Sequence, residues 1–205
     1  MESSKTELYL IRHGETEWNI AQRYQGHTDV GLSDVGREQT QLVAKRLKEQ
    51  GVDIVYSSDL VRAHDTAKQI GLETGAEVIV NSDLRELNFG EWEGKTFTEI
   101  QNEYGDLVER WYRDPVNLLI PGGEKFTDLR QRSSDFVGKI LEDNKGKRIA
   151  VVSHGGTIRT IICGLLDISL TKIWNFKQDN TAINIFHIFD QCPVVVTLND
   201  SNHLG

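Results

Sequence analysis

The sequence predicts an α/β protein of three layers (α/β/α), in which helices cover both faces of a largely parallel central sheet. Short apolar runs alternate with amphipathic helical patterns along the 205 residues, and repeated βα units of this kind imply parallel strands. Several apolar runs are also followed directly by residues with titratable or charged side chains. Side chains of that kind belong at the carboxyl edge of an open α/β sheet, where ligands bind.

The strands are expected where short runs rich in Val, Ile and Leu stand between polar or glycine-containing segments. These runs are residues 7–11, 53–56, 77–80, 148–153, 182–189 and 194–198. The last two are expected to form a hairpin around residues 190–193.

Capping residues and apolar spacing predict the helices. Ser33 should cap a helix that runs to about Gln50 and stops at Gly51; its inward apolar members are expected to be Val35, Leu42, Val43 and Leu47. Ser58 or Asp59 should cap the next helix, whose inward members are Leu60, Ala63, Ala67 and Ile70. Further helices are expected over residues 125–143 and 157–166. Short helices over residues 96–114 should end before Pro115.

The length fits a single domain that comprises residues 1–205. Residues 89–124 form the least regular segment and include the loop Pro121-Gly122-Gly123. This segment is therefore the candidate for a small helical cap over the sheet edge.

Composition argues against several classes of partner. The formal net charge is −8 and no long basic run offsets it, so a general nucleic-acid or membrane-surface binder is not expected. The first six residues are polar and no apolar run approaches the roughly 20 residues of a membrane span. Cys163 and Cys192 lack CxxC spacing, which favours a reduced, cytoplasmic protein with Cys163 in the core. Whether the chain is a monomer or a homodimer stays open.

Two strand ends carry a histidine followed by glycine. Arg12-His13-Gly14-Glu15 follows the first predicted strand, and His154-Gly155 follows the fourth. Two imidazoles at one sheet edge suggest that both face one anion, with His13 as a possible nucleophile. Arg62 and Glu86 follow the second and third strands and could reach the same edge.

This set of side chains supports phosphoryl transfer through histidine. A neutral imidazole can attack phosphorus, while the guanidiniums of Arg12 and Arg62 bind the non-bridging oxygens. His154 can add a donor, and Glu86 can protonate the leaving oxygen and then activate water. Because Arg and His supply the positive charge, neither a metal nor another cofactor is expected.

Five ordered motifs resemble those of the histidine phosphatase superfamily, which includes phosphoglycerate mutases, fructose-2,6-bisphosphatases and α-ribazole phosphatases. The resemblance covers about residues 7–190. The motifs are Leu10-Ile11-Arg12-His13-Gly14-Glu15-Thr16-Glu17-Trp18-Asn19, then Arg23 to Gly36, Tyr56 to Ala67, Leu84-Arg85-Glu86 with Phe89 to Gly94, and Pro121-Gly122-Gly123-Glu124 with Val152 to Gly156.

The resemblance implies a role for each matching position. It implies that His13 is the phosphorylated nucleophile, that Arg12, Arg62 and His154 form the phosphate pocket, and that Glu86 is the proton donor. Asn19, Gln25 and the amide of Gly155 are implied as further substrate contacts.

Other interpretations of single residues stay open. Glu91 or Glu93 could replace Glu86 as the acid, and Gln25 could be a surface residue. Trp92, Trp111 and Tyr112 could line a substrate pocket or pack the cap. The remaining histidines are not expected to be catalytic; they are His27, His64, His187 and His203.

The short segment between Gly94 and Pro121 lacks a proline-rich insertion and resembles the phosphatase branch. The predicted function is therefore a metal-independent phosphomonoesterase that acts on a small phosphorylated metabolite through phosphohistidine. A cofactor-dependent phosphoglycerate mutase is the first alternative, and a non-catalytic phospholigand-binding protein is the second. α-Ribazole phosphate, phosphosugars, phosphoglycerates and nucleotides all remain candidate substrates.

Overall fold

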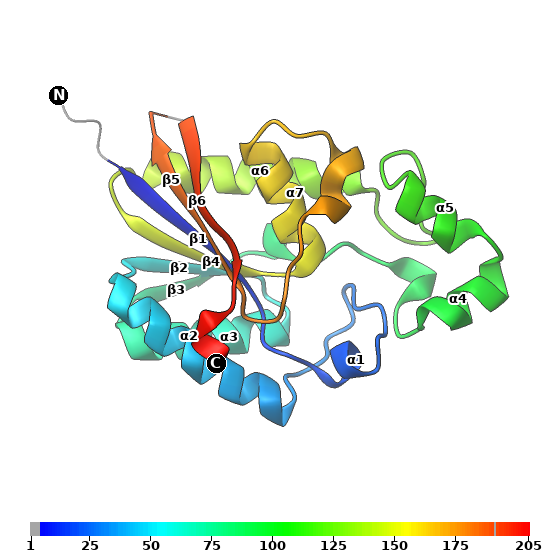
Figure 1. Ribbon diagram of the computed structural model, residues 1–205, viewed down its shortest axis with the longest axis horizontal. Coiled ribbons are helices and arrows are strands. Elements are labelled where there is room, and N and C mark those ends of the chain that lie inside the picture. The colour runs from blue at the N-terminus through cyan, green and yellow to red at the C-terminus, as the bar shows by residue number, and fades with distance from the viewer. Residues whose placement is uncertain (1–4, 191) are drawn as a thin grey trace.

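The sheet has six strands, and four neighbouring ones, from one edge inward, run parallel (Figure 1). A computed structural model describes residues 5–190 and 192–205. The strands are β1 (Thr6–Arg12), β2 (Ile54–Ser57), β3 (Glu77–Val80), β4 (Arg148–Ser153), β5 (Ile183–Phe189) and β6 (Cys192–Asp200). Their order is β3-β2-β4-β1-β5-β6, with the first four parallel and the β5–β6 hairpin antiparallel. The largely parallel α/β fold is thus confirmed, although Gln191 of the expected turn and residues 1–4 lie outside the described residues.

Two helices cover each face of the sheet (Figure 1). Helices α2 (Asp34–Gln50) and α3 (Val61–Thr74) pack on the face that carries Tyr9 and Ile11. Helices α6 (Phe126–Asp143) and α7 (Gly155–Leu165) pack on the face that carries Leu8 and Leu10. Because alternate side chains of β1 point to opposite faces, both clusters share this strand, and together they bury its residues 8–11.

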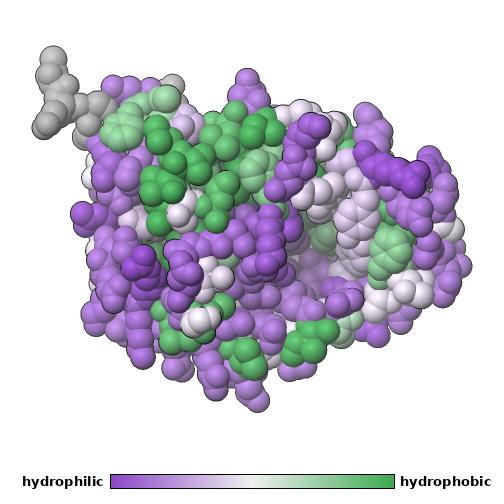
Figure 2. All heavy atoms as spheres, viewed as in Figure 1, coloured by the Kyte–Doolittle hydropathy of each residue, from purple (hydrophilic) through white to green (hydrophobic). Residues whose placement is uncertain are grey.

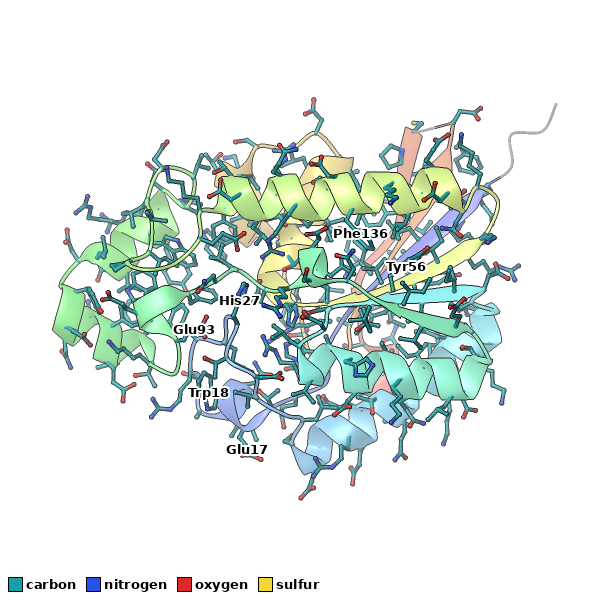
Figure 3. The ribbon with its side chains drawn as sticks, turned by 180° about the vertical axis from the view of Figure 1, so that it is seen from behind. Glu17, Trp18, His27, Tyr56, Glu93 and Phe136 are labelled. Carbon is teal, nitrogen blue, oxygen red and sulfur yellow. The ribbon has the colours of Figure 1, made fainter. Side chains whose placement is uncertain are left out.

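Figure 3 shows how a helix is fixed on the sheet. Tyr56 of β2 points toward Phe136 of α6, and their ring centroids lie 5.7 Å apart. Asn144, just after α6, donates from its side-chain amide to the Tyr56 hydroxyl at 3.1 Å. This contact ties the end of α6 to the parallel part of the sheet.

Several sequence expectations about helices were wrong in detail. Val35 and Leu42 are 50% and 39% exposed, and Thr40 and Ala44 are buried on α2 instead. Neither Ser58 nor Asp59 caps α3, which follows Leu60 without a side-chain cap of its own. The acceptor comes from a distant loop, because Asp29 Oδ1 accepts the N–H of Val61 at 2.7 Å.

Residues 89–124 lie to one side of the sheet (Figure 1) and contain α4 (Phe97–Tyr104) and α5 (Leu107–Arg113). They share an apolar cluster with Phe126 of α6 and Ile173 of the 3-10 helix η3 (Leu170–Asn175). Trp92 and Trp111 are almost fully buried there, so both pack the cluster, whereas Tyr112 is 39% exposed. The short remaining helices are α1 (Glu17–Ile20), η1 (Ser82–Leu84), η2 (Gly90–Trp92) and η4 (Asn202–Leu204).

The surface of the β5–β6 side is partly apolar. Figure 2 shows hydrophobic side chains gathered over this hairpin, and Val194, Val195, Val196 and Leu198 of β6 are exposed. None of the helices in the described part of the chain combines the length and hydropathy needed to cross a bilayer.

Candidate active site

The two predicted His-Gly sites lie beside each other. Arg12 of β1 pairs with Ser153 of β4 in parallel register, so His13 and His154 each follow the last pair of neighbouring strands. Their ring centroids lie 5.2 Å apart, and both rings are buried. The juxtaposition follows from strand register and needs no loop contact.

The tautomer of His13 leaves one ring nitrogen free. Its Nδ1 lies 2.7 Å from the carbonyl oxygen of Gly14. A carbonyl can only accept, so Nδ1 carries the proton and Nε2 of the neutral ring has a free electron pair. Burial, followed by the charges of Arg62 and Arg12, lowers the pKa of His13 well below its ordinary value. The free protein therefore holds a neutral imidazole suited to nucleophilic attack.

Arg12 and Arg62 are anchored by backbone carbonyls. Arg12 Nη1 donates to Gln178 at 2.7 Å, and Arg62 donates to Gly26 at 2.8 Å and to Thr28 at 3.1 Å. Burial lowers the pKa of each guanidinium to about 10, so both stay charged at neutral pH. The Nε atoms of both are buried and have no hydrogen-bond partner within the described residues. These donors are available to an anion.

His154 also keeps one nitrogen unengaged. Its Nε2 lies 2.9 Å from Ser58 Oγ, while its buried Nδ1 has no partner among residues 5–190 and 192–205. Burial and then the charge of Arg62 lower the pKa of His154 well below its ordinary value. A bound anion would oppose the effect of these cations and favour a protonated, donating ring.

The Glu86 carboxylate lies at the N-terminus of α7. Its Oε2 accepts the N–H of Gly156 at 2.9 Å, and its Oε1 accepts the N–H of Thr157 at 3.1 Å. A helix N-terminus favours an anion because its N–H groups are unpaired and the helix dipole is positive there. The helix therefore holds Glu86 in one orientation beside the residues that follow His154.

The two alternative acids are engaged elsewhere. Glu93 accepts the N–H groups of His27 and Thr28, both at 2.7 Å, and Figure 3 shows Glu93 and His27 where two loops meet. Glu91 accepts from the hydroxyl of Tyr104 at 2.6 Å, on the surface. Of the three carboxylates, Glu86 is the one held at the helix end that follows His154.

Asn19 and Gln25 contribute side-chain amides near His13. Asn19 Oδ1 accepts the N–H of Thr16 at 3.1 Å in a capping box, which leaves its NH₂ group for a ligand. Gln25 is only 8% exposed. Its Oε1 accepts from Thr16 Oγ1 at 2.8 Å, and its buried Nε2 has no partner in the described chain. Gly155 is the first residue of α7, so its N–H has no intrahelical acceptor.

An ion pair that the sequence did not reveal supports Glu86. Arg132 of α6 bonds to Glu124, with Nε and Oε1 2.8 Å apart, and its Nη2 donates to the backbone carbonyl of Glu86 at 2.8 Å. Glu124 also accepts the N–H of Asn88 at 3.2 Å. The Pro-Gly-Gly-Glu motif therefore secures the loop that carries Glu86.

Arg159, also missed, lies one helical turn after Gly155 on α7. Its Nε donates to the carbonyl of Phe176 at 2.7 Å, and its guanidinium lies 5.8 Å from the ring centroid of Trp174. The pattern His154-Gly155 followed by an arginine four residues later could have indicated it, because i and i+4 share a helix face.

Together the site offers a neutral imidazole, several cationic donors and a carboxyl group. These groups can catalyse in-line phosphoryl transfer by positioning the reacting atoms and stabilising negative charge. Within the described residues, no group of three or more His, Cys, Asp and Glu side chains could hold a metal ion.

The comparisons with known proteins agree with this chemistry. The sequence model of the histidine phosphatase superfamily (branch 1) matches residues 8–201. Phosphoserine phosphatase 1 of Hydrogenobacter thermophilus is 34% identical over 97% of this chain and 94% of that protein. The metal-independent phosphoserine phosphatase of Arabidopsis thaliana is 38% identical over 100% of this chain and 86% of that protein.

The chain is also similar to phosphoglycerate mutase-like protein 4 of Arabidopsis thaliana, with 40% identity over 90% of this chain and 80% of that protein. Among solved structures, a mutant phosphoserine phosphatase of Entamoeba histolytica in complex with phosphoserine superimposes with a TM-score of 0.87. It is 35% identical and covers 98% of this chain and 100% of that one.

Proposed function

Since the chain belongs to branch 1 of the histidine phosphatase superfamily and is a phosphoric monoester hydrolase, we propose that it hydrolyses phosphoserine through a phosphohistidine at His13. The main support for His13 as the nucleophile is the hydrogen bond between His13 Nδ1 and the Gly14 carbonyl. This bond places the proton on Nδ1 and leaves Nε2 unprotonated beside Arg12, Arg62 and His154.

In the first step, His13 Nε2 attacks phosphorus and the phosphorus–oxygen bond of the ester breaks. Arg12 and Arg62 bind the non-bridging oxygens, and the amide of Gly155 adds a donor. Glu86, entering as the acid, gives its proton to the departing alkoxide. The products of this step are the free alcohol and a phosphoramidate on His13.

In the second step, water attacks the phosphohistidine. The Glu86 carboxylate takes a proton from that water, and the nitrogen–phosphorus bond breaks. Inorganic phosphate leaves, His13 is again neutral, and Glu86 is again an acid. No step calls for a metal ion, since guanidinium and imidazole groups supply the positive charge.

The substrate is proposed from the relatives, several of which are named phosphoserine phosphatases. Phosphoserine is not among the substrates that the sequence motifs alone suggest. It is monophosphorylated and anionic, which suits a site whose donors are guanidinium and imidazole groups. A cytoplasmic location, and a monomer or homodimer, remain predictions from the sequence.

The test is to trap the intermediate. Wild-type protein in EDTA is mixed with phosphoserine that carries a labelled phosphoryl group, and the reaction is quenched in alkali, where phosphohistidine survives. The label should map to His13, and His13→Ala should lower kcat by at least about 10³ because the covalent route is lost. The control is His64→Ala, a histidine on α3 away from the site. A His13→Ala protein that keeps most of its activity contradicts the proposal.

A further inference from the structure

Arg159 is a guanidinium that the hydrolytic steps above do not use. Its Nε bond to Phe176 and its position over the Trp174 ring hold it in place. It takes part in none of the ion pairs of the described residues. Arg159 is partly buried, and Glu86 and Asp179 act on its charge only at longer range, because none of the described carboxylates forms a salt bridge with it. An anion from outside the chain can therefore supply the direct partner that this charge lacks.

Arg159 borders the phosphate pocket. A Cβ atom built on Gly155 would stand 3.1 Å from Arg159 Nη1 and 3.7 Å from Arg12 Nε. Two guanidiniums therefore flank the first residue of α7, where unpaired N–H groups already favour an anion. The charge of Arg159 also contributes to the lowered pKa of Arg12. An anion bound between them would relieve this repulsion.

The surroundings of Arg159 differ from those of Arg12 and Arg62. The charges of Arg12 and Arg62 act on His13 directly, since both help to lower the pKa of its imidazole. Arg159 instead lies among Phe176, Trp174 and Tyr112, on the side of the apolar cluster shared with residues 89–124. A phosphoryl group attached to His13 already has Arg12, Arg62 and His154 as donors. Arg159 therefore remains as a donor for the part of the substrate beyond the ester oxygen.

We propose that Arg159 determines substrate specificity by binding the carboxylate of a phosphorylated carboxylic acid. The inference rests on the proposed phosphatase reaction and adds the group that distinguishes one phosphate ester from another. Arg suits this role because its planar fork matches a carboxylate with two parallel hydrogen bonds. The amide of Gly155 and Arg12 would stay with the phosphoryl group, so that one substrate spans both guanidiniums.

The experiment compares matched substrates with and without the carboxylate. Phosphoserine is paired with phosphoethanolamine, and 3-phosphoglycerate is paired with glycerol 1-phosphate. Wild-type protein, Arg159→Gln and Arg159→Lys are assayed by phosphate release, with Arg113→Gln on α5 as the control. Wild type should favour the carboxylate member of each pair. Arg159→Gln should lower kcat/KM for that member by about 10- to 100-fold, as expected for a lost charge-assisted bond, mainly through KM.

Arg159→Gln should leave the carboxylate-free esters within a few-fold of wild type, and this activity also shows that the variant is folded. Arg159→Lys should recover part of the preference, because it keeps the charge and loses the fork. Equal losses on both members of a pair, or a wild-type enzyme without preference for the carboxylate, overturn the assignment of Arg159 while the phosphatase reaction stands. A wild-type protein that releases phosphate from none of the four esters defeats the proposed function, and the inference falls with it.

Discussion

The backbone N–H of His13 donates to the carbonyl oxygen of Ser153 at 3.0 Å, which continues the β1–β4 ladder by one residue. Because Arg12 and Ser153 are paired in register, this bond fixes how far each strand runs before its histidine. The spacing of the two imidazoles is thus set by the backbone of the sheet. A shift of either strand by one residue in this register would send its histidine to the opposite face and separate the two rings.

Replacing Glu86 should separate substrates by their leaving groups. Glu86→Gln should reduce kcat for phosphoserine, whose alkoxide needs a proton, by about 10²–10⁴. It should reduce kcat for p-nitrophenyl phosphate far less, because nitrophenolate leaves without one. Steady-state assays on both esters measure the contrast. Glu91→Gln and Glu93→Gln serve as comparisons, and the same contrast in either of them would move the acid role to that residue.

Gly156 should be intolerant of a side chain. A Cβ there would stand 2.5 Å from Glu86 Oε1, so Gly156→Ala should displace the carboxylate and reproduce the leaving-group dependence of Glu86→Gln. The matched control is Gly138→Ala on α6, where a Cβ meets no atom within 4 Å. That change should keep full activity and raise the free energy of unfolding by up to about 1 kcal/mol through helix propensity. Wild-type kinetics in Gly156→Ala would show that the contact with Glu86 does not matter.

Mild acid should destabilise the fold through its two buried histidines. The pKa values of His13 and His154 are lowered in the folded state, whereas unfolded histidine titrates near 6.5. Below about pH 6.5 the unfolded chain therefore binds protons that the native state does not. The free energy of unfolding should fall as pH drops, by up to about 1.4 kcal/mol per pH unit for each histidine.

Urea denaturation at several values between pH 7.5 and 5 measures this slope. The doubly substituted His13→Gln, His154→Gln protein is the reference, and its stability should change less over the same range. Identical slopes in the two proteins would mean that other groups titrate there. Above about pH 7.5 the two histidines should contribute no further change, since both states then hold them neutral.

Water should hydrolyse the phosphohistidine faster than its phosphoryl group is transferred to another hydroxyl of the substrate. A mutase must shield its phosphohistidine from water while the intermediate turns over, and the predicted cap, residues 89–124, contributes just two short helices, α4 of 8 residues and α5 of 7 residues. Phosphorus NMR on 3-phosphoglycerate, with 2,3-bisphosphoglycerate present, should show inorganic phosphate as the main product. Isomerisation to 2-phosphoglycerate that outruns phosphate release would favour the mutase alternative instead.

Sequence patterns predicted those features of the molecule that depend on neighbours along the chain. The apolar runs gave the strands, and Ser33 caps α2 through a bond to the N–H of Gly36 at 3.0 Å. The burial of Cys163 was also predicted correctly. Because strand ends of a parallel sheet share one edge, the convergence of His13 and His154 could be predicted from order alone.

Features that depend on distant partners could not be predicted in this way. The cap of α3 comes from Asp29, which accepts the N–H of a residue 32 positions later, Val61, so neither local candidate, Ser58 or Asp59, caps the helix. Glu124 and Arg132 stabilise the Glu86 loop through contacts that only the packed fold creates. The spacing after Gly155 places Arg159 on the same helix face, but its closeness to Arg12 depends on the packed fold.

The anchoring of His13 and His154 in β1 and β4 has a consequence for how the molecule opens. These strands lie in the middle of the six-stranded order, and all of their residues except Glu7, Arg12 and Arg148 are buried. Their amide protons should exchange with deuterated solvent only when the whole chain unfolds, whereas those of α4 and α5 should exchange through smaller local openings. The nucleophile would then lie next to the slowest-exchanging strands, and α4 and α5 could open locally without displacing the reacting nitrogen of His13.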